Sequence, residues 1–243
     1  MQPYEIGERR FDMIERIVPA GSGRIRGLII IALLLVVSQC SNAGGKIGIY
    51  GIRMVPYGID AKQYSDLGWG GGLHAVVPLP SASNIIAGTA GLEIINLLSE
   101  VETFTDGLTG LRVEQHTDQT YSRFFIGAQV GGHGNGFFRP HAGLNMALVY
   151  YEYRIDITVP DDYDRERDIR QNVDQRGKFA FGYDVTLGLD LNFSNTVALD
   201  GGVRYLKSVS VPQQLGEGTV RIHPQYFQIY IGVGIAFEMI HNP

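Results

Sequence analysis

The chain has 243 residues, of which 44% are hydrophobic and 19% are charged, and its formal net charge is −5. This length allows one large β domain or two small ones, and the composition argues against intrinsic disorder. An acidic chain without a basic patch is not expected to bind nucleic acid.

The first segment, residues 1–43, has the pattern of a signal peptide. Five arginines form its basic part: Arg9, Arg10, Arg16, Arg24 and Arg26. An unbroken apolar run follows at 28–37, and Ser41 and Ala43 then place small residues before a cleavage site at Gly44. A run this short is typical of a signal peptide, because a spanning helix needs about 20 apolar residues.

Alternatives for this segment stay open at the sequence level. Met13 is a second candidate start, and the apolar run would also serve as an N-terminal membrane anchor. Cys40 is the only cysteine, but Gln39 stands where a lipoprotein signal has a small residue. Cleavage after Ala43 would leave one domain, residues 44–243, with no disulfide and no cysteine metal site.

From Gly44 onward, eight segments alternate apolar residues with small or polar ones, which is the pattern of β-strands with two different faces. In chain order we expect strands at 46–55, 67–77, 86–98, 121–130, 137–154, 179–192, 196–207 and 226–238. The clearest is 179–192, FAFGYDVTLGLDLN, in which every odd-numbered residue is large and apolar. The third is the poorest, because Asn96 falls on its apolar face. In the first, we assign Tyr50, Ile52 and Met54 to the outward apolar face.

The connections alternate between short turns (78–84, 131–136 and 193–195) and long loops (57–66, 99–120, 155–177 and 208–225). An even strand number with short turns at one end and long loops at the other is typical of transmembrane barrels, whose short turns face the periplasm. In lipid such a sheet must close on itself, because lipid offers the backbone no hydrogen bonds. We therefore predict an all-β fold, an eight-stranded antiparallel up-and-down transmembrane β-barrel, preceded by a signal peptide.

The inward positions of this barrel are glycine, polar or charged, as expected where side chains fill a narrow interior. The predicted interior polar network consists of Arg53, His74, Glu93, Arg123, Gln129, Arg139, Asn145, Asp184, Asp190, Asp200, Arg204, Gln228 and Glu238, with His141 also inward. Buried charges must be paired. A symmetric hairpin through 193–195 predicts a salt bridge between Arg204 and Asp184, and one through 131–136 places Arg139 opposite Gln129. We interpret the network as a polar filling of the barrel, with a conducting pathway as the alternative.

Three strings, FRPHAGLN at 138–145, ALDGGVRY at 198–205 and GVGIAF at 232–237, resemble strands of the OmpA-like and opacity-like eight-stranded outer-membrane barrels. The resemblance covers roughly residues 46–238. It implies a Gram-negative outer membrane, with outer-membrane lipids and the barrel assembly machinery as partners, and we expect a monomer. Two features depart from the family: residues 238–243 follow the final aromatic Phe237, and no peptidoglycan-binding domain is present.

No enzymatic or cofactor motif is found. The six histidines lie outside any nucleophile motif, and no phosphate loop, HExxH motif or Cys/His spacing occurs. We therefore expect no catalytic residue, no cofactor and no metal. The acidic segment 155–177 lacks the spacing of an EF-hand, and we interpret it as a solvated loop of mixed charge rather than a cation site.

The predicted function is a structural or surface-interaction role, with surface partners reached through loops 99–120 and 155–177. The first alternative is a narrow pore or transporter for small or hydrophobic solutes. The second is a soluble periplasmic barrel that turns its apolar faces inward around a lipid.

Overall fold

A computed structural model describes residues 45–79, 85–105, 110, 112–131, 136–160, 169–194, 196–215 and 218–237. The predicted signal segment, Glu238, residues 161–168 and much of the three predicted short turns lie outside the described residues.

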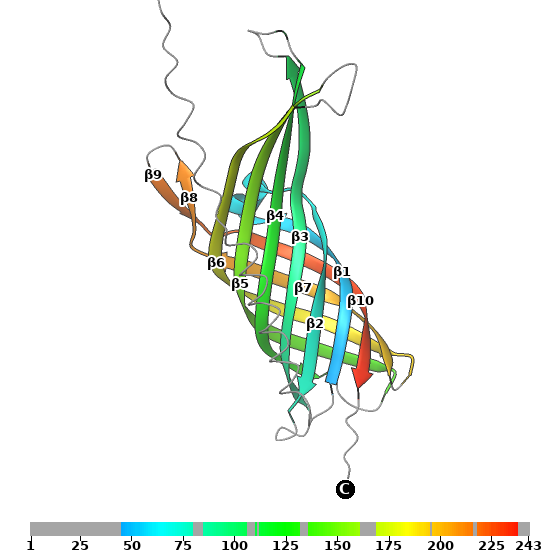
Figure 1. Ribbon diagram of the computed structural model, residues 1–243. Helices are drawn as coiled ribbons and strands as arrows, with labels where there is room; N and C mark the ends of the chain where they lie inside the picture. Colours follow the sequence, from blue (N-terminus) through cyan, green and yellow to red (C-terminus); the bar gives the residue numbers. More distant parts are fainter. Residues whose placement is uncertain are drawn as a thin grey trace, which may run out of the picture. The chain divides into compact units, whose positions relative to one another are not determined.

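Eight strands close into one barrel (Figure 1), in the spatial order β1-β10-β7-β6-β5-β4-β3-β2. Their bounds are β1 Gly45–Tyr57, β2 Gly68–Pro78, β3 Ile86–Thr105, β4 Arg112–Gly131, β5 Phe138–Val159, β6 Ile169–Asn192, β7 Val197–Val209 and β10 Gln225–Phe237. All neighbours are antiparallel, and β1 pairs with β10 to close the sheet. The predicted eight-stranded up-and-down barrel is confirmed.

Two further elements lie in the long connections. Helix α2 (Gly58–Tyr64) follows β1, and strands β8 (Val211–Leu215) and β9 (Gly218–Ile222) form a small hairpin between β7 and β10. Among the described residues, no helix combines the length and apolar character needed to cross a membrane.

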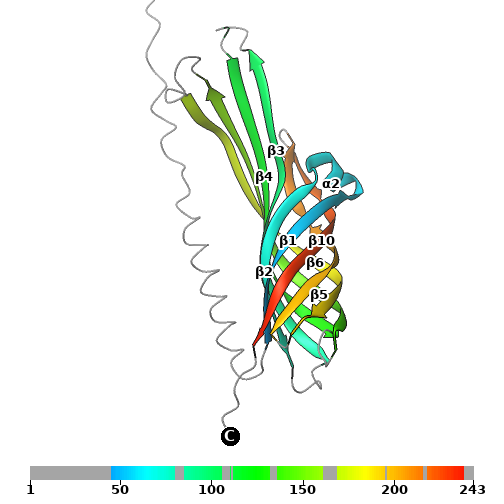
Figure 2. The same cartoon turned by 90° about the vertical axis from the view of Figure 1, so that its right-hand side faces the viewer.

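Two of the predicted long loops are largely strand, so the prediction for 99–120 and 155–177 is wrong in this respect. Pairing of β3 with β4 continues to Thr105 and Arg112, and pairing of β5 with β6 continues to Val159 and Ile169. These extensions rise beyond the rest of the barrel, at the end where α2 lies (Figure 2). The side chains of β3 beyond Leu98 are exposed on both of its faces, and such a segment lacks the one-sided apolar alternation by which the other strand segments are recognised.

Strands β3 to β6 are longer than the other barrel strands. Strands β1, β7 and β10 have 13 residues each. At about 3.3 Å per residue and a tilt of about 40°, such a strand crosses roughly 33 Å, which exceeds the apolar band of about 25 Å. Strands β3 to β6 have 20 to 24 residues, which is more than such a crossing requires.

The outside of the barrel is apolar. Its exposed side chains include Trp69, Ile94, Ile126, Leu144, Leu187, Val203 and Ile231, each from a different strand. Such a continuous apolar surface is stable only when another apolar phase covers it, and a barrel placed in lipid meets that condition. The soluble barrel required the opposite arrangement, with the apolar faces inside.

Strand β1 is reversed relative to the prediction. Tyr50, Ile52 and Met54 are buried inside the barrel, while Arg53 lies on the outer face, with its guanidinium carbon 4.4 Å from the centroid of the Trp69 ring. Ile47 and Ile49 are exposed on that outer face. Because this strand carries apolar residues on both faces, alternation alone does not determine its orientation.

Asn96 marks an irregularity in β3. The register with β4 shifts between Asn96 and Leu98, which leaves Leu97 as an extra residue. Ile95 and Leu97 are buried, whereas Asn96 is exposed on the outer face. A β-bulge of this kind re-aims side chains and bends a strand, and here it lies where β3 leaves the barrel to form its extension.

Inward glycines create the space that the interior side chains occupy. A Cβ atom at Gly232 would lie 2.6 Å from the Cα atom of Tyr50. We expect Gly232→Ala to lower the free energy of unfolding by about 1–3 kcal/mol through overpacking. Gly51→Ala is the matched control, because its Cβ would face outward with its nearest neighbour 3.9 Å away. Urea unfolding of the refolded barrel measures both, and equal losses would contradict this account.

Candidate functional site

The middle of the barrel holds a network of buried charges, here named the central cluster. Its members are Tyr50, Glu93, Arg123, Asn145, Asp184, Arg204 and Gln228, from seven of the eight barrel strands. Glu93 is 0% exposed and Arg123 is 1% exposed. The Arg123 guanidinium lies 2.7 Å from Glu93 Oε2 and 2.9 Å from Asp184 Oδ2, and Arg204 forms an ion pair with Glu93 Oε1. Two cations thus meet two carboxylates.

Neutral groups complete the hydrogen bonding of these carboxylates. The Tyr50 hydroxyl donates to Glu93 Oε1 at 2.6 Å, and Gln228 Nε2 donates to Glu93 Oε2 at 3.1 Å. Asn145 Nδ2 donates to Asp184 Oδ1 at 2.7 Å. Buried charges are tolerated when they are paired and hydrogen-bonded in this way, so the central cluster ties the strands together across the barrel.

The hairpin registers differ from those expected. Arg204 lies opposite Thr186, not Asp184. The β6–β7 hairpin is therefore centred one residue further along the chain than predicted. Gln129 lies opposite Gly143 rather than Arg139. Hairpin register is set by the turn geometry, and Gly131, at the end of β4, has a φ of +83°. The predicted Arg204–Asp184 salt bridge is therefore wrong: Asp184 pairs with Arg123 and Arg204 pairs with Glu93.

A second group of polar side chains lies near the short-turn end and is named the turn-end cluster. Its members are Lys46, His74, His141, Asp190 and Asp200. Lys46 Nζ lies 2.5 Å from Asp190 Oδ1 and 3.1 Å from Asp200 Oδ2. His74 Nε2 lies 3.2 Å from Asp200 Oδ2, and the Tyr230 hydroxyl lies 3.2 Å from His141 Nε2.

The remaining residues of the predicted interior network belong to neither cluster. Gln129 is buried, whereas Arg139 lies at the short-turn end and its Nε donates to the Gly136 carbonyl in an exposed hydrogen bond. Arg53 is on the outer face, so its assignment to the interior is wrong. Glu238 lies outside the described residues.

Sequence reasoning missed two polar interior residues of β1. Lys46 and Tyr50 share a face with Ile52 and Met54, the face that alternation assigns to lipid, and this face lies inside the barrel. The clue was Lys46 itself, because a lysine is expensive on a lipid-facing surface. Arg53 favoured the opposite orientation of the strand, because an arginine is also expensive on a lipid-facing surface. It avoids this energetic cost by lying over the ring of Trp69 near the end of the strand.

The two clusters leave little open space in the interior. A cavity of about 20 Å³ lies between them, and its lining includes His74, His141, Asp200 and Arg204. That is enough room for about one water molecule.

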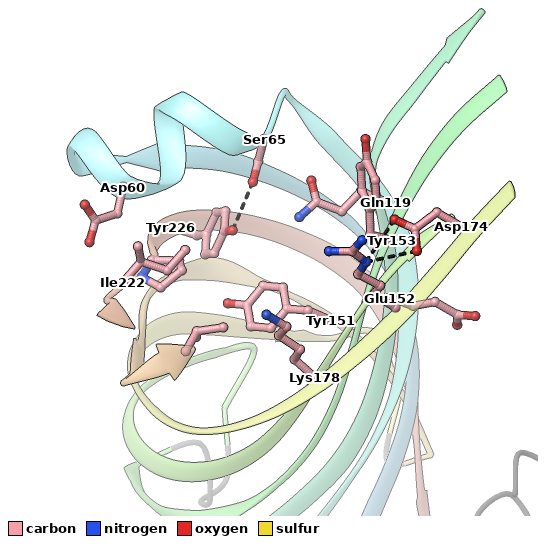
Figure 3. A pocket seen from close by; sticks show the side chains of 13 residues that line it. Asp60, Ser65, Gln119, Tyr151, Glu152, Tyr153, Asp174, Lys178, Ile222 and Tyr226 are labelled. Atoms are coloured by element: carbon pink, nitrogen blue, oxygen red, sulfur yellow. Dashed lines mark hydrogen bonds and ion pairs between the residues drawn. The ribbon is translucent and has the colours of Figure 1, made fainter. Parts of the chain in front are cut away.

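A larger pocket of about 310 Å³ opens at the long-connection end and is named the outer pocket. Val211, Ile222, Tyr151 and Tyr226 provide apolar surface in its lining, and Figure 3 shows Ile222, Tyr151 and Tyr226 below helix α2. The lining also includes five charged side chains: Asp60, Glu152, Asp174, Arg176 and Lys178. The outer pocket therefore offers aromatic rings beside charges of both signs.

Hydrogen bonds fix the walls of the outer pocket. Ser65 and Tyr226 share one between their hydroxyl groups at 3.1 Å, as Figure 3 shows, and Tyr151 and Ser208 share another at 2.8 Å. Arg176 Nε lies 2.9 Å from Asp174. The pocket is a preformed concave surface of the kind that binds small molecules or a protruding side chain.

Comparison with solved structures supports the eight-stranded barrel at the level of the fold. No family model matches the chain, and no curated protein matches it. Among solved structures, Neisserial surface protein A matches with a TM-score of 0.52 and 13% identity, covering 79% of this chain and 97% of that one. Ail of Yersinia pestis matches with a TM-score of 0.42 and 14% identity, covering 80% of this chain and 97% of that one. Outer membrane protein H of Pseudomonas aeruginosa matches with a TM-score of 0.41 and 14% identity, covering 80% of this chain and 100% of that one.

The chain thus has the fold of the small eight-stranded bacterial outer-membrane barrels. The resemblance seen in the sequence is confirmed at this level by Neisserial surface protein A.

Proposed function

We propose that this protein is an integral outer-membrane barrel that acts by surface contact and does not conduct solutes. The main support is the contrast between its two ends. The central cluster fills the interior with paired, buried charges, and the cavity beside it measures only about 20 Å³. The outer pocket of about 310 Å³ is lined by residues of α2 and of the β8–β9 hairpin, and the strand extensions rise at the same end of the barrel as α2 (Figure 2).

The extensions of β3 to β6 offer two features suited to a protein partner. Apolar side chains are exposed on them, namely Val101, Phe104, Tyr153 and Val173. Among the described residues, β3 beyond Leu98 pairs only with β4, and β6 before Phe181 pairs only with β5. Each therefore leaves one edge of backbone groups open, and an open edge can accept a strand from another chain.

The orientation follows from the architecture of such barrels, in which short turns face the periplasm and long connections face outside. The extensions and the outer pocket are then extracellular. A partner would meet the exposed edges first, while a ligand of limited size would enter the outer pocket between α2 and the β8–β9 hairpin. Both contacts leave the barrel interior closed.

Conductance in planar lipid bilayers tests the proposal against the pore alternative. Wild-type protein is expected to show no discrete current steps, because its interior cavity holds about one water molecule. A large-pore porin added to the same bilayer provides the positive control. Reproducible unitary steps from the wild-type protein would overturn the proposal and support a narrow pore.

A shortened variant tests the surface role itself. Ser99 lies opposite Asp118 and Leu98 opposite Gln119, so residues 99–118 can be replaced by a two-residue turn without changing the register of the barrel. Cells that display this variant are expected to lose the autoaggregation or surface adhesion conferred by the wild type, while the barrel keeps its heat-modifiable gel migration. Unchanged adhesion would exclude the β3–β4 extension as the contact surface.

A further inference from the structure

The turn-end cluster carries an unbalanced charge. Asp190 and Asp200 lie directly opposite each other on β6 and β7, and both are buried. Two carboxylates so placed repel each other unless a cation lies between them. Among the described ion pairs, Lys46 is the only permanent cation that contacts either of them. The pair therefore has one positive charge against two negative ones, whereas the central cluster is balanced.

Two histidines surround the same carboxylates and leave polar atoms without partners. His74 and His141 are each 7% exposed, and Asp200 is 3% exposed. Within the described part of the chain, His74 Nδ1, His141 Nδ1 and Asp200 Oδ1 have no hydrogen-bond partner. Buried polar atoms are normally satisfied, so these atoms indicate a site that takes a further species.

Space for that species is present. His74, His141 and Asp200 all line the cavity of about 20 Å³, which accommodates one water molecule or one ion. Glycines on the neighbouring strands make room for the side chains of the cluster: a Cβ atom at Gly48 would lie 3.0 Å from His74 Nε2, and one at Gly234 would lie 2.8 Å from Lys46 Cδ.

The donor atoms are close to the spacing of a metal site. One ligand atom from each of His141, Asp190 and Asp200 lies within 4.8 Å of the others. Zinc holds nitrogen and oxygen ligands at about 2.0–2.2 Å, which separates ligand atoms by roughly 3.3–3.5 Å in a tetrahedral site. Side-chain rotations that bring the three groups together by up to about 1.4 Å would give this spacing. Imidazole and carboxylate donors together suit zinc better than calcium or magnesium.

We propose that the turn-end cluster is a binding site for a divalent transition metal, zinc above all, with His141, Asp190 and Asp200 as ligands. Lys46 holds the two carboxylates in the metal-free protein, and the metal replaces its ammonium group. The Lys46 side chain is 12% exposed, so it can turn toward the short-turn opening when the metal enters. His74 contacts Asp200 and orients it.

The competition between Lys46 and the metal gives the site a specific signature. We expect tag-free wild-type protein, refolded in detergent, to bind one Zn²⁺ in equilibrium dialysis and calorimetry. Lys46→Gln should bind Zn²⁺ at least tenfold more tightly, because it removes the competing cation. His141→Asn should bind at least tenfold more weakly, and His116→Asn, which alters an exposed histidine on the β4 extension, should match the wild type.

Cobalt provides a readout that needs no variant. Co²⁺ bound to wild-type protein is expected to give the intense visible absorption of a tetrahedral nitrogen and oxygen site, and Zn²⁺ should displace it. The proposal is overturned if neither wild type nor Lys46→Gln binds Zn²⁺, or if Lys46→Gln and His141→Asn bind it as the wild type does. Either result would leave the proposed surface role unaffected.

Discussion

Replacing Arg123 by methionine is expected to lower the free energy of unfolding by about 3–5 kcal/mol, the usual cost of removing one partner from a buried ion pair. Arg123 contacts both Glu93 and Asp184, and its side chain is 1% exposed. Glu93 would keep Arg204 as a partner, but Asp184 would lose its only described ion pair and keep neutral donors. The central cluster would then carry one uncompensated negative charge.

Charge balance makes a further prediction that simple loss of packing would not. The double variant Arg123→Met with Asp184→Leu removes one charge of each sign and leaves the Glu93–Arg204 pair intact. We expect it to recover at least half of the stability lost by Arg123→Met, because paired charges can often be replaced by apolar groups of similar volume at little cost.

The measurement is equilibrium unfolding by urea in lipid vesicles, followed by tryptophan fluorescence from Trp69. Arg154→Met serves as the control, because Arg154 forms an ion pair with Asp156 on the exposed extension of β5. Exposed pairs contribute about 0–1 kcal/mol. If Arg123→Met cost no more than this control, or if the double variant were the least stable of the three, the central cluster would not be what holds the interior together.

How far the sequence predicts this structure depends on whether the two faces of a strand differ. On β6, large apolar residues alternate with small and polar ones, so both its strand character and its orientation are evident. On β1, Ile47 and Ile49 face outward while Tyr50 and Ile52 face inward. Apolar residues on both faces satisfy either orientation, and the choice is made by where Lys46 and Tyr50 find partners across the barrel.

The candidate sites were predictable only in part, for two physical reasons. Inward-facing charges can be recognised from alternation, but their partners lie on non-neighbouring strands, as with Arg123 and Asp184. When a residue faces a partner two positions further along, as Arg204 does across the β6–β7 hairpin, the side chains that it can reach across the barrel also change. The outer pocket has no sequence signature at all, because α2, β6 and the β8–β9 hairpin come together there only after the barrel has closed.

Introducing arginine at Ile231 is expected to cost about 2–4 kcal/mol, the value for a lipid-facing arginine near the middle of the bilayer. Ile231 is the central residue of β10, lies opposite Gly51 and Gly201, and is 61% exposed. In water, such an exposed position would accept arginine almost without cost. The penalty therefore arises only if lipid covers this face.

Val101→Arg is the matched control, because Val101 is 56% exposed on the extension of β3, beyond the part that crosses the membrane. Side chains of similar size and exposure are thus replaced by the same residue in two different surroundings. Unfolding in vesicles should show the full loss for Ile231→Arg and less than about 0.5 kcal/mol for Val101→Arg. Equal effects would mean that both faces contact the same medium. In that case the apolar outer surface would not be a membrane-contacting one, and the proposed extracellular position of the extensions would fail with it.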